Sequence, residues 1–102
     1  MAAQNAPIPI ETRLVRLRGR VQGVGFREGC VEAATAFDVT GWVRNRLDGS
    51  VEALLQGPAD TLDRMQRWLA DGLPAARVDA IEVMPADAPA ARFTRFERRP
   101  TA

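Results

Sequence analysis

The residues from Gln22 to Arg27, Gln-Gly-Val-Gly-Phe-Arg, place two glycines and an arginine where an alternating pattern gives way to a helical one. Gly23 and Gly25 permit positive φ angles and a close approach by another group. The first backbone N–H groups of the following helix have no partner within it, and the helix dipole is positive there. Such a loop can bind phosphate or carboxylate without a metal, and Arg27 can hold two phosphate oxygens at once. A plain strand-to-helix turn would also need glycine, so the loop alone leaves both interpretations open.

The elements on either side of this loop are indicated by hydrophobic periodicity. In the stretch from Arg13 to Val21, the odd positions from 15 on are apolar or small (Val15, Leu17, Gly19, Val21) and the even positions from 16 on are arginines (Arg16, Arg18, Arg20), which is typical of a half-buried strand. After the loop, apolar residues recur at spacings of three and four between residues 30 and 37. This pattern predicts a helix of about three turns with one apolar face, ending near Asp38.

The rest of the chain predicts a hairpin, a second helix and two further strands. Residues 41–45 and 51–55 are expected to form antiparallel strands, joined by a turn at 47–50 whose Asp-Gly pair supplies positive φ. A helix should begin at Pro58 or Asp60 and stop at Gly72. The buried stripe of this helix is expected to consist of Leu62, Met65, Trp68 and Leu69. A fourth strand is expected at 78–83, a linker at 85–91 and a last short strand around Phe93 and Phe96.

This order of elements predicts an α+β fold of the ferredoxin-like, split β-α-β type. We expect an antiparallel sheet of four to five strands with two helices on one face. A chain of 102 residues with 46% apolar composition suits a single domain. Residues 1–11 are expected to form a flexible tail without signal-peptide character, and residues 12–99 the domain.

Composition limits the partners and the compartment. Fourteen arginines against thirteen acidic residues give a net charge of +1, so no global field recruits nucleic acid or a membrane surface. No apolar stretch is long enough to span a membrane. The lone Cys30 cannot form an internal disulfide, which favours a reducing, cytoplasmic location. Without histidine an ordinary zinc site cannot be built, and we expect no metal and no cofactor.

Two segments together resemble the acylphosphatase family, and the resemblance spans residues 13 to 98. They are the loop ending in Gly25-Phe26-Arg27, and Gly41-Trp42-Val43-Arg44-Asn45 followed by Asp48-Gly49-Ser50-Val51-Glu52. The resemblance implies metal-independent hydrolysis of small acyl phosphates to a carboxylate and inorganic phosphate, by a protein we expect to be a monomer. It implies a catalytic pair, Arg27 on phosphate and Asn45 on the attacking water. The phosphate-binding backbone would be that of Gln22, Gly23, Val24, Gly25, Phe26 and Arg27.

These residue types are chemically sufficient for such a reaction. Phosphoryl transfer has a loose transition state, so a protein mainly positions the groups and stabilises charge on the equatorial oxygens. The amide of Asn45 offers an acceptor and a donor, and can hold a water in line with the scissile bond. It cannot take a proton, and the resemblance implies that a phosphate oxygen of the substrate does so. The alternative role for Asn45 is to cap the hairpin.

The chain departs from the family pattern just after Arg27, where Gly29 replaces a bulky, often aromatic residue. Glycine in the first turn of a helix costs about 1 kcal/mol relative to alanine. Glu28 places a negative charge beside the anion site, unless it simply favours the helix N-terminus and points into solvent. The expected consequence concerns substrate affinity more than reaction type.

Other reactive side chains have simpler interpretations. Cys30 lacks the arginine six residues later that a cysteine phosphatase needs, and is expected to pack in the core. Asp48 is explained by the turn and Glu52 by an outward, solvated strand face. The arginines at 92, 95, 98 and 99 are expected to form a solvated strand edge.

Two competing functions belong to other classes. An RNA-binding ferredoxin-like module would stack bases on aromatic residues of its central strands, and residues 13–21 and 51–55 contain none. A non-catalytic, regulatory domain is the second, since acylphosphatase-like domains also occur inside larger proteins such as hydrogenase-maturation carbamoyltransferases. We expect a free-standing domain, which ranks this alternative lower.

Overall fold

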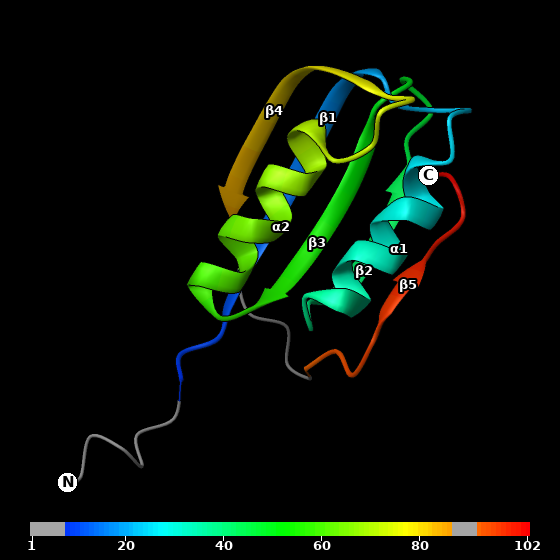
Figure 1. Ribbon diagram of the computed structural model, residues 1–102. Coiled ribbons are helices and arrows are strands. Elements are labelled where there is room, and N and C mark those ends of the chain that lie inside the picture. The colour runs from blue at the N-terminus through cyan, green and yellow to red at the C-terminus, as the bar shows by residue number, and fades with distance from the viewer. Residues whose placement is uncertain (1–7, 87–91) are drawn as a thin grey trace, which may run out of the picture.

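The computed structural model describes residues 8–86 and 92–102 of the chain. Both helices cover one face of a five-stranded sheet whose strand order is β4-β1-β3-β2-β5 (Figure 1). Most of the predicted tail, 1–11, and most of the predicted linker, 85–91, lie outside the described residues. The elements are β1 Glu11–Arg20, α1 Phe26–Ala36, β2 Thr40–Asn45, β3 Val51–Gly57, α2 Ala59–Asp71, β4 Arg77–Pro85 and β5 Phe96–Arg98.

The predicted ferredoxin-like fold is confirmed, with one correction to the sheet. The pairs β1–β3, β1–β4 and β2–β3 are antiparallel, as predicted. However, β5 pairs with β2 in parallel, Phe96 lying opposite Gly41 and Arg98 opposite Val43, so the sheet is mixed. The physical reason is the position at which β4 ends. The last residue of β4, Pro85, lies opposite Arg13, near the start of β1. The start of β1 and the start of β2 lie at the same end of the sheet, because both strands run antiparallel to β3. A strand that starts from this end runs in the same direction as β2.

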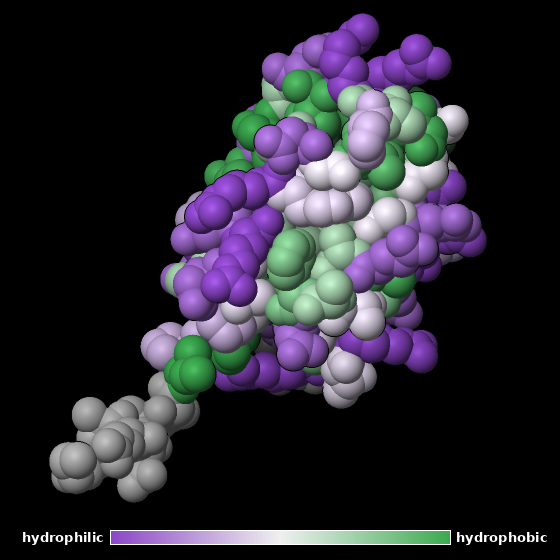
Figure 2. All heavy atoms as spheres, in the orientation of Figure 1, coloured by the Kyte–Doolittle hydropathy of each residue, from purple (hydrophilic) through white to green (hydrophobic). Residues whose placement is uncertain are grey.

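The core lies between the sheet and the two helices. Val15 and Leu17 of β1 are fully buried there, and the predicted stripe of α2 supplies Leu62, Met65 and Leu69. Hydrophilic side chains gather along the outer surface of α2 (Figure 2). Cys30 of α1 is also buried, as expected for a packing residue, and this burial raises the pKa of its thiol far above the ordinary value. A thiol in this environment is a poor nucleophile.

Gly29 has a packing reason that the sequence did not reveal. A Cβ atom built on Gly29 would lie only 3.1 Å from Cη2 of Trp68. The indole of Trp68 meets the ring of Phe26 edge to face, with ring centroids 5.7 Å apart. The absent side chain on α1 therefore makes room for an aromatic side chain from α2, and the two helices approach closely beside the β1–α1 loop.

The expectation that Glu52 is solvated is wrong. Its side chain points away from the helices, as the alternation predicted, but the residue is only 3% exposed. Arg16 of β1 and Arg44 of β2 lie opposite Glu52 in the strand register, and their guanidinium groups contact its carboxylate at 2.8 and 2.7 Å. Arg46 adds a third contact at 3.6 Å. The arginines cover the carboxylate, so a buried ionic cluster lies on the open face of the sheet.

These contacts set the direction of the Glu52 pKa. Burial alone would raise it, but hydrogen bonds from Arg16 and Arg44, with the charges of Arg44 and Arg46, outweigh burial and lower it below the ordinary 4.5. A carboxyl group whose pKa is lower in the folded state stabilises the protein at pH values above the pKa that the group has in the unfolded state. That contribution is lost as the pH falls through the folded-state value.

We therefore predict that Glu52→Gln lowers the free energy of unfolding by about 1–3 kcal/mol at about pH 7, because the half-buried guanidinium groups lose their charged, buried acceptor. The difference from the unsubstituted protein should shrink as the pH falls through the lowered pKa of Glu52 and the carboxylate becomes protonated. Urea unfolding over a series of pH values from neutral to acidic measures this. Glu82→Gln on the same face is the matched control. Glu82 is half exposed, and its ion pair with Arg18 is a long one, 3.7 Å from Oε1 to Nε. An equal pH dependence in all three proteins would contradict the prediction.

Candidate active site

The loop between β1 and α1 depends on two glycines in left-handed conformations. Gly23 has φ +74° and Gly25, the N-cap of α1, has φ +80° and ψ +20°. Added Cβ atoms at these two positions would meet nothing within 4 Å, so the backbone angles and not a lack of space require glycine. Gly29 N–H donates a hydrogen bond to the carbonyl oxygen of Gly25 at 3.1 Å. Among the described residues, it is the first backbone N–H after Gly23 that bonds to the loop. The N–H groups in between remain available to an anion.

One pocket of about 240 Å³ joins this loop to the end of β2. The predicted phosphate-binding loop contributes Gly23, Gly25, Phe26 and Arg27 to its lining, and the predicted water-orienting Asn45 lies in the same pocket. The two motifs that are 18 residues apart in the sequence thus meet in space. The full lining is Val21, Gly23, Gly25, Phe26, Arg27, Glu28, Asn45 and Arg98.

Gln22 and Val24, the other two residues of the predicted loop, have different surroundings. Val24 packs against the core. The side chain of Gln22 reaches the β2–β3 hairpin, where Nε2 donates to the carbonyl oxygens of Arg46 at 2.8 Å and Ser50 at 2.9 Å. Only a backbone role was expected of Gln22, yet its side chain joins the loop by hydrogen bonds to the hairpin that carries Asn45.

Asn45 is fixed through its backbone while its side chain stays free. It pairs with Val51 of β3, and its carbonyl oxygen accepts a hydrogen bond from the N–H of Ala102 at 3.0 Å. Its side chain shares the helix-covered face with Val43, because alternate residues of a strand face the same way. Within the described ranges that amide makes no hydrogen bond, and the turn is instead closed by Asp48, which accepts from Ser50 N–H and Oγ–H. These bonds hold the pKa of Asp48 at about 2.

Arg27 differs electrostatically from the other arginines. Most described arginines lie within 4 Å of a carboxylate oxygen. Arg27 has no such partner among the residues described here, and it is half-buried. The other described arginines without an acidic partner are all exposed: Arg20, Arg64, Arg67 and Arg92. Arg27 is therefore a half-buried guanidinium whose charge no carboxylate in the described part of the chain neutralises.

Two expectations about charged residues near the pocket need correction. Glu28 is largely exposed, as one interpretation held, but its Oε1 accepts a hydrogen bond from Nη1 of Arg98 at 3.1 Å. Arg98 is more than a solvated residue at the edge of the sheet, because it also lines the pocket. Arg99 lies over the ring of Trp42 at 5.1 Å, whereas Arg95 is 80% exposed and fits the expectation. No sequence signal indicated that β5 would place Arg98 beside α1.

Comparison with known proteins agrees with this geometry. A sequence model of the acylphosphatase family matches residues 14–98. The chain belongs to the acylphosphatase family. Acylphosphatase 1 of Ralstonia nicotianae is 60% identical over 90 residues, which cover 88% of both proteins. The crystal structure of acylphosphatase from Bacillus subtilis superposes with a TM-score of 0.80 at 34% identity, covering 89% of this chain and 99% of that one.

Membership of this family confirms the predicted enzyme class, a hydrolase of the acylphosphatase type. A second structure, an acylphosphatase from Coxiella burnetii, has a TM-score of 0.82 at 31% identity and covers 88% of this chain and 93% of its own. In the part of the chain described, no helix is long and apolar enough to cross a membrane. The same residues contain no group of three or more His, Cys, Asp or Glu side chains placed to hold a metal ion.

The two hydrogen bonds from the Gln22 side chain to the β2–β3 hairpin, called the Gln22 tether below, lead to a prediction. Gln22→Ala should lower kcat/KM by about tenfold, because small displacements of reacting groups are costly. It should also cost about 1–2 kcal/mol of stability through two lost hydrogen bonds. Gln66→Ala is the matched control, since Gln66 on α2 accepts a hydrogen bond from Arg13 far from the pocket lining. Steady-state kinetics and thermal unfolding measure both effects, and equal kcat/KM in the two variants would contradict the role of the tether.

Proposed function

We propose that this protein hydrolyses acyl phosphates in the pocket between the β1–α1 loop and Asn45, without a metal. The observation that supports the proposal is the content of that one pocket. Within residues 8–86 and 92–102, it combines a half-buried Arg27 without an acidic partner, loop N–H groups without acceptors and a side-chain amide of Asn45 that makes no hydrogen bond. These are donors for a phosphate and a group that can orient water.

In the proposed reaction Arg27 and the loop amides bind the phosphate oxygens. The guanidinium offers a planar fork that matches two of these oxygens. The loop amides add donors whose positions are fixed by Gly23 and Gly25 before substrate arrives. Donors already in place stabilise the charge on the equatorial oxygens at the transition state without further reorganisation.

Asn45 acts on the water in this mechanism. Its carbonyl oxygen accepts a hydrogen bond from the water and its NH₂ group donates to the phosphate or to the water oxygen. The water oxygen forms the new P–O bond while the bond to the acyl oxygen breaks, and the carboxylate leaves with the electron pair. A phosphate oxygen takes the proton of the water, because Glu28, the carboxylate in the pocket lining, is paired with Arg98.

Partners and compartment follow as parts of the same proposal. A small acyl phosphate is the substrate, and we propose a cytoplasmic monomer whose catalytic domain, 12–99, works without the tail 1–11. The buried thiol of Cys30 suits a reducing compartment. Nucleic acid is not a proposed partner, since Trp42 on the open face is only 8% exposed and Arg44 and Arg99 lie over its ring.

The protein should cleave acyl phosphates but not alkyl phosphate monoesters, with or without a chelator. A carboxylate leaves unprotonated at neutral pH because its conjugate acid has a pKa of about 4, as for a free Asp or Glu side chain. An alkoxide would need a general acid or a metal, which the proposed residues do not supply. Measuring kcat/KM for acetyl phosphate and for an alkyl phosphate tests this. Comparable values, or loss of activity in chelator that Mg²⁺ restores, would overturn the mechanism.

The proposed division of roles predicts different kinetics for substitutions of Arg27 and Asn45. Arg27→Lys keeps the charge but loses the fork, so inorganic phosphate should inhibit at least about tenfold more weakly. Asn45→Ala should lower kcat at least about a hundredfold while phosphate inhibits nearly as before, because water orientation matters mainly in the transition state. Thermal unfolding checks that both variants remain folded. Lost phosphate affinity with normal kcat in Asn45→Ala would make Asn45 a binding residue instead.

A further inference from the structure

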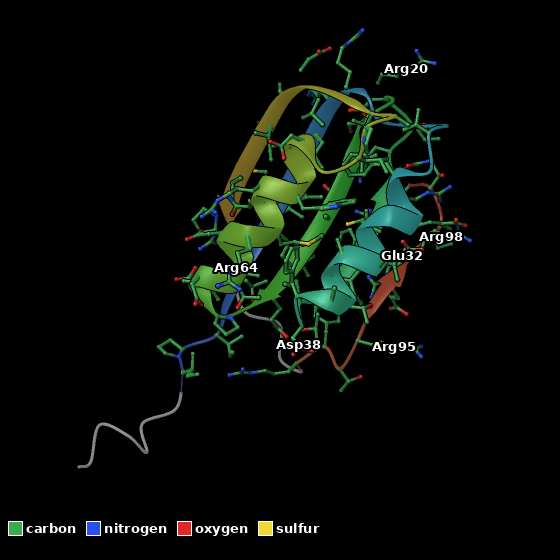
Figure 3. The ribbon with its side chains drawn as sticks, viewed as in Figure 1. Arg20, Glu32, Asp38, Arg64, Arg95 and Arg98 are labelled. Carbon is green, nitrogen blue, oxygen red and sulfur yellow. The ribbon has the colours of Figure 1, made fainter. Side chains whose placement is uncertain are left out.

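The pocket contains a second guanidinium, that of Arg98, which the proposed mechanism does not use. Arg98 is the last residue of β5 and lies opposite Val43, two residues before Asn45 on β2. Figure 3 shows its side chain beside α1 near Glu32, while Arg95 projects at the opposite end of β5. The parallel pairing of β5 with β2 is what brings a C-terminal arginine to the pocket.

Glu28 forms an ion pair with Arg98 at the rim of the pocket. The distance between Arg98 Nη1 and Glu28 Oε1 is 3.1 Å, and Glu28 directly follows Arg27 in the chain. A lone carboxylate at the rim of an anion pocket would repel a phosphate, whereas a carboxylate paired with arginine is neutralised. The pair therefore keeps the rim close to neutral while it orients a guanidinium next to the substrate.

The same ion pair borders a second hollow. This hollow has a volume of about 320 Å³ and is lined by Glu28, Val31, Glu32 and Arg98. Both hollows share Glu28 and Arg98, so the pair lies at the boundary between them. The first pocket contains the phosphate donors and the water-orienting amide, and the second hollow adds space directly beside it.

We propose that the second hollow receives the acyl group and that Arg98 contacts the carboxyl oxygens of the leaving group. The inference rests on the proposed function, since it names the acyl-binding part of the same site. As the P–O bond breaks, negative charge develops on the departing carboxylate, and a fixed guanidinium stabilises that charge. Arginine keeps its proton at neutral pH, so Arg98 stabilises the departing carboxylate by charge and does not act as the general acid that an alkoxide leaving group would need.

The leaving group supplies a readout that a merely structural role would not change. A set of substituted benzoyl phosphates varies the pKa of the released acid while the phosphate end stays constant. If Arg98 stabilises the departing charge, its removal should harm substrates with the more basic leaving groups most. The plot of log kcat/KM against leaving-group pKa should then become steeper in Arg98→Ala.

The experiment compares the unsubstituted protein, Arg98→Ala and the control Arg95→Ala on this series, with inorganic phosphate as inhibitor. Arg95 is a suitable control because it also flanks β5, pairs with Glu97 at 3.7 Å and is 80% exposed. We expect Arg98→Ala to lose about tenfold in kcat/KM for the most basic leaving group, as for one charge-assisted contact. Its phosphate inhibition constant should change by about twofold or less, and Arg95→Ala should match the unsubstituted protein throughout.

Three results would overturn this inference alone: equal kinetics in the two variants, a loss that is the same for every leaving group, or a parallel loss of phosphate affinity. The last result would make Arg98 a phosphate ligand. Failure of the unsubstituted protein to cleave any of the acyl phosphates would overturn the proposed function itself. Because the Arg98 side chain is 50% exposed, thermal unfolding should show that Arg98→Ala remains folded.

Discussion

The left-handed conformation of Gly23 and Gly25 is the constraint on which the site depends. With these backbone angles β1 passes into α1 within five residues, and the N–H groups of the turn find no acceptor among the described residues. A residue with a Cβ atom would be strained here although space is available. The anion site is thus built by the backbone first, and Arg27 adds charge to donors that the turn has already positioned.

Asn45 depends on the same turn through contacts that lie far apart in the sequence. Gln22 joins the turn to the hairpin by two hydrogen bonds, and Ala102 bonds to the backbone of Asn45 and of Leu47 from the other side. A water-orienting amide is useful only if its position relative to the phosphate is fixed. The loop, the hairpin and the segment after β5 converge on this residue, and none of them could hold it alone.

Periodicity and turn residues predicted the helices and strands, because these signals are local, and the resemblance to a known family singled out the two motifs. Local signals could not predict neighbours. The alternation in β3 gave the correct face for Glu52 but not the arginines that cover it, which come from β1 and β2. Gly29 looked like a defect in α1 because its partner, Trp68, lies on α2. The parallel pairing of β5 follows from the end of the sheet at which β4 stops, and the residues around Phe96 indicate a short strand but not its direction.

The arginine-only composition poses a problem that the structure solves by environment. All fourteen cationic side chains are arginines, and each could in principle grip a phosphate with two hydrogen bonds. Pairing with carboxylates neutralises most of those described. Fully solvated guanidinium groups bind weakly, because exposed ion pairs contribute little in water. Half-burial, absence of an acidic partner among the described residues and adjacent free amides coincide at Arg27. Its surroundings, more than its residue type, make it the phosphate-binding arginine.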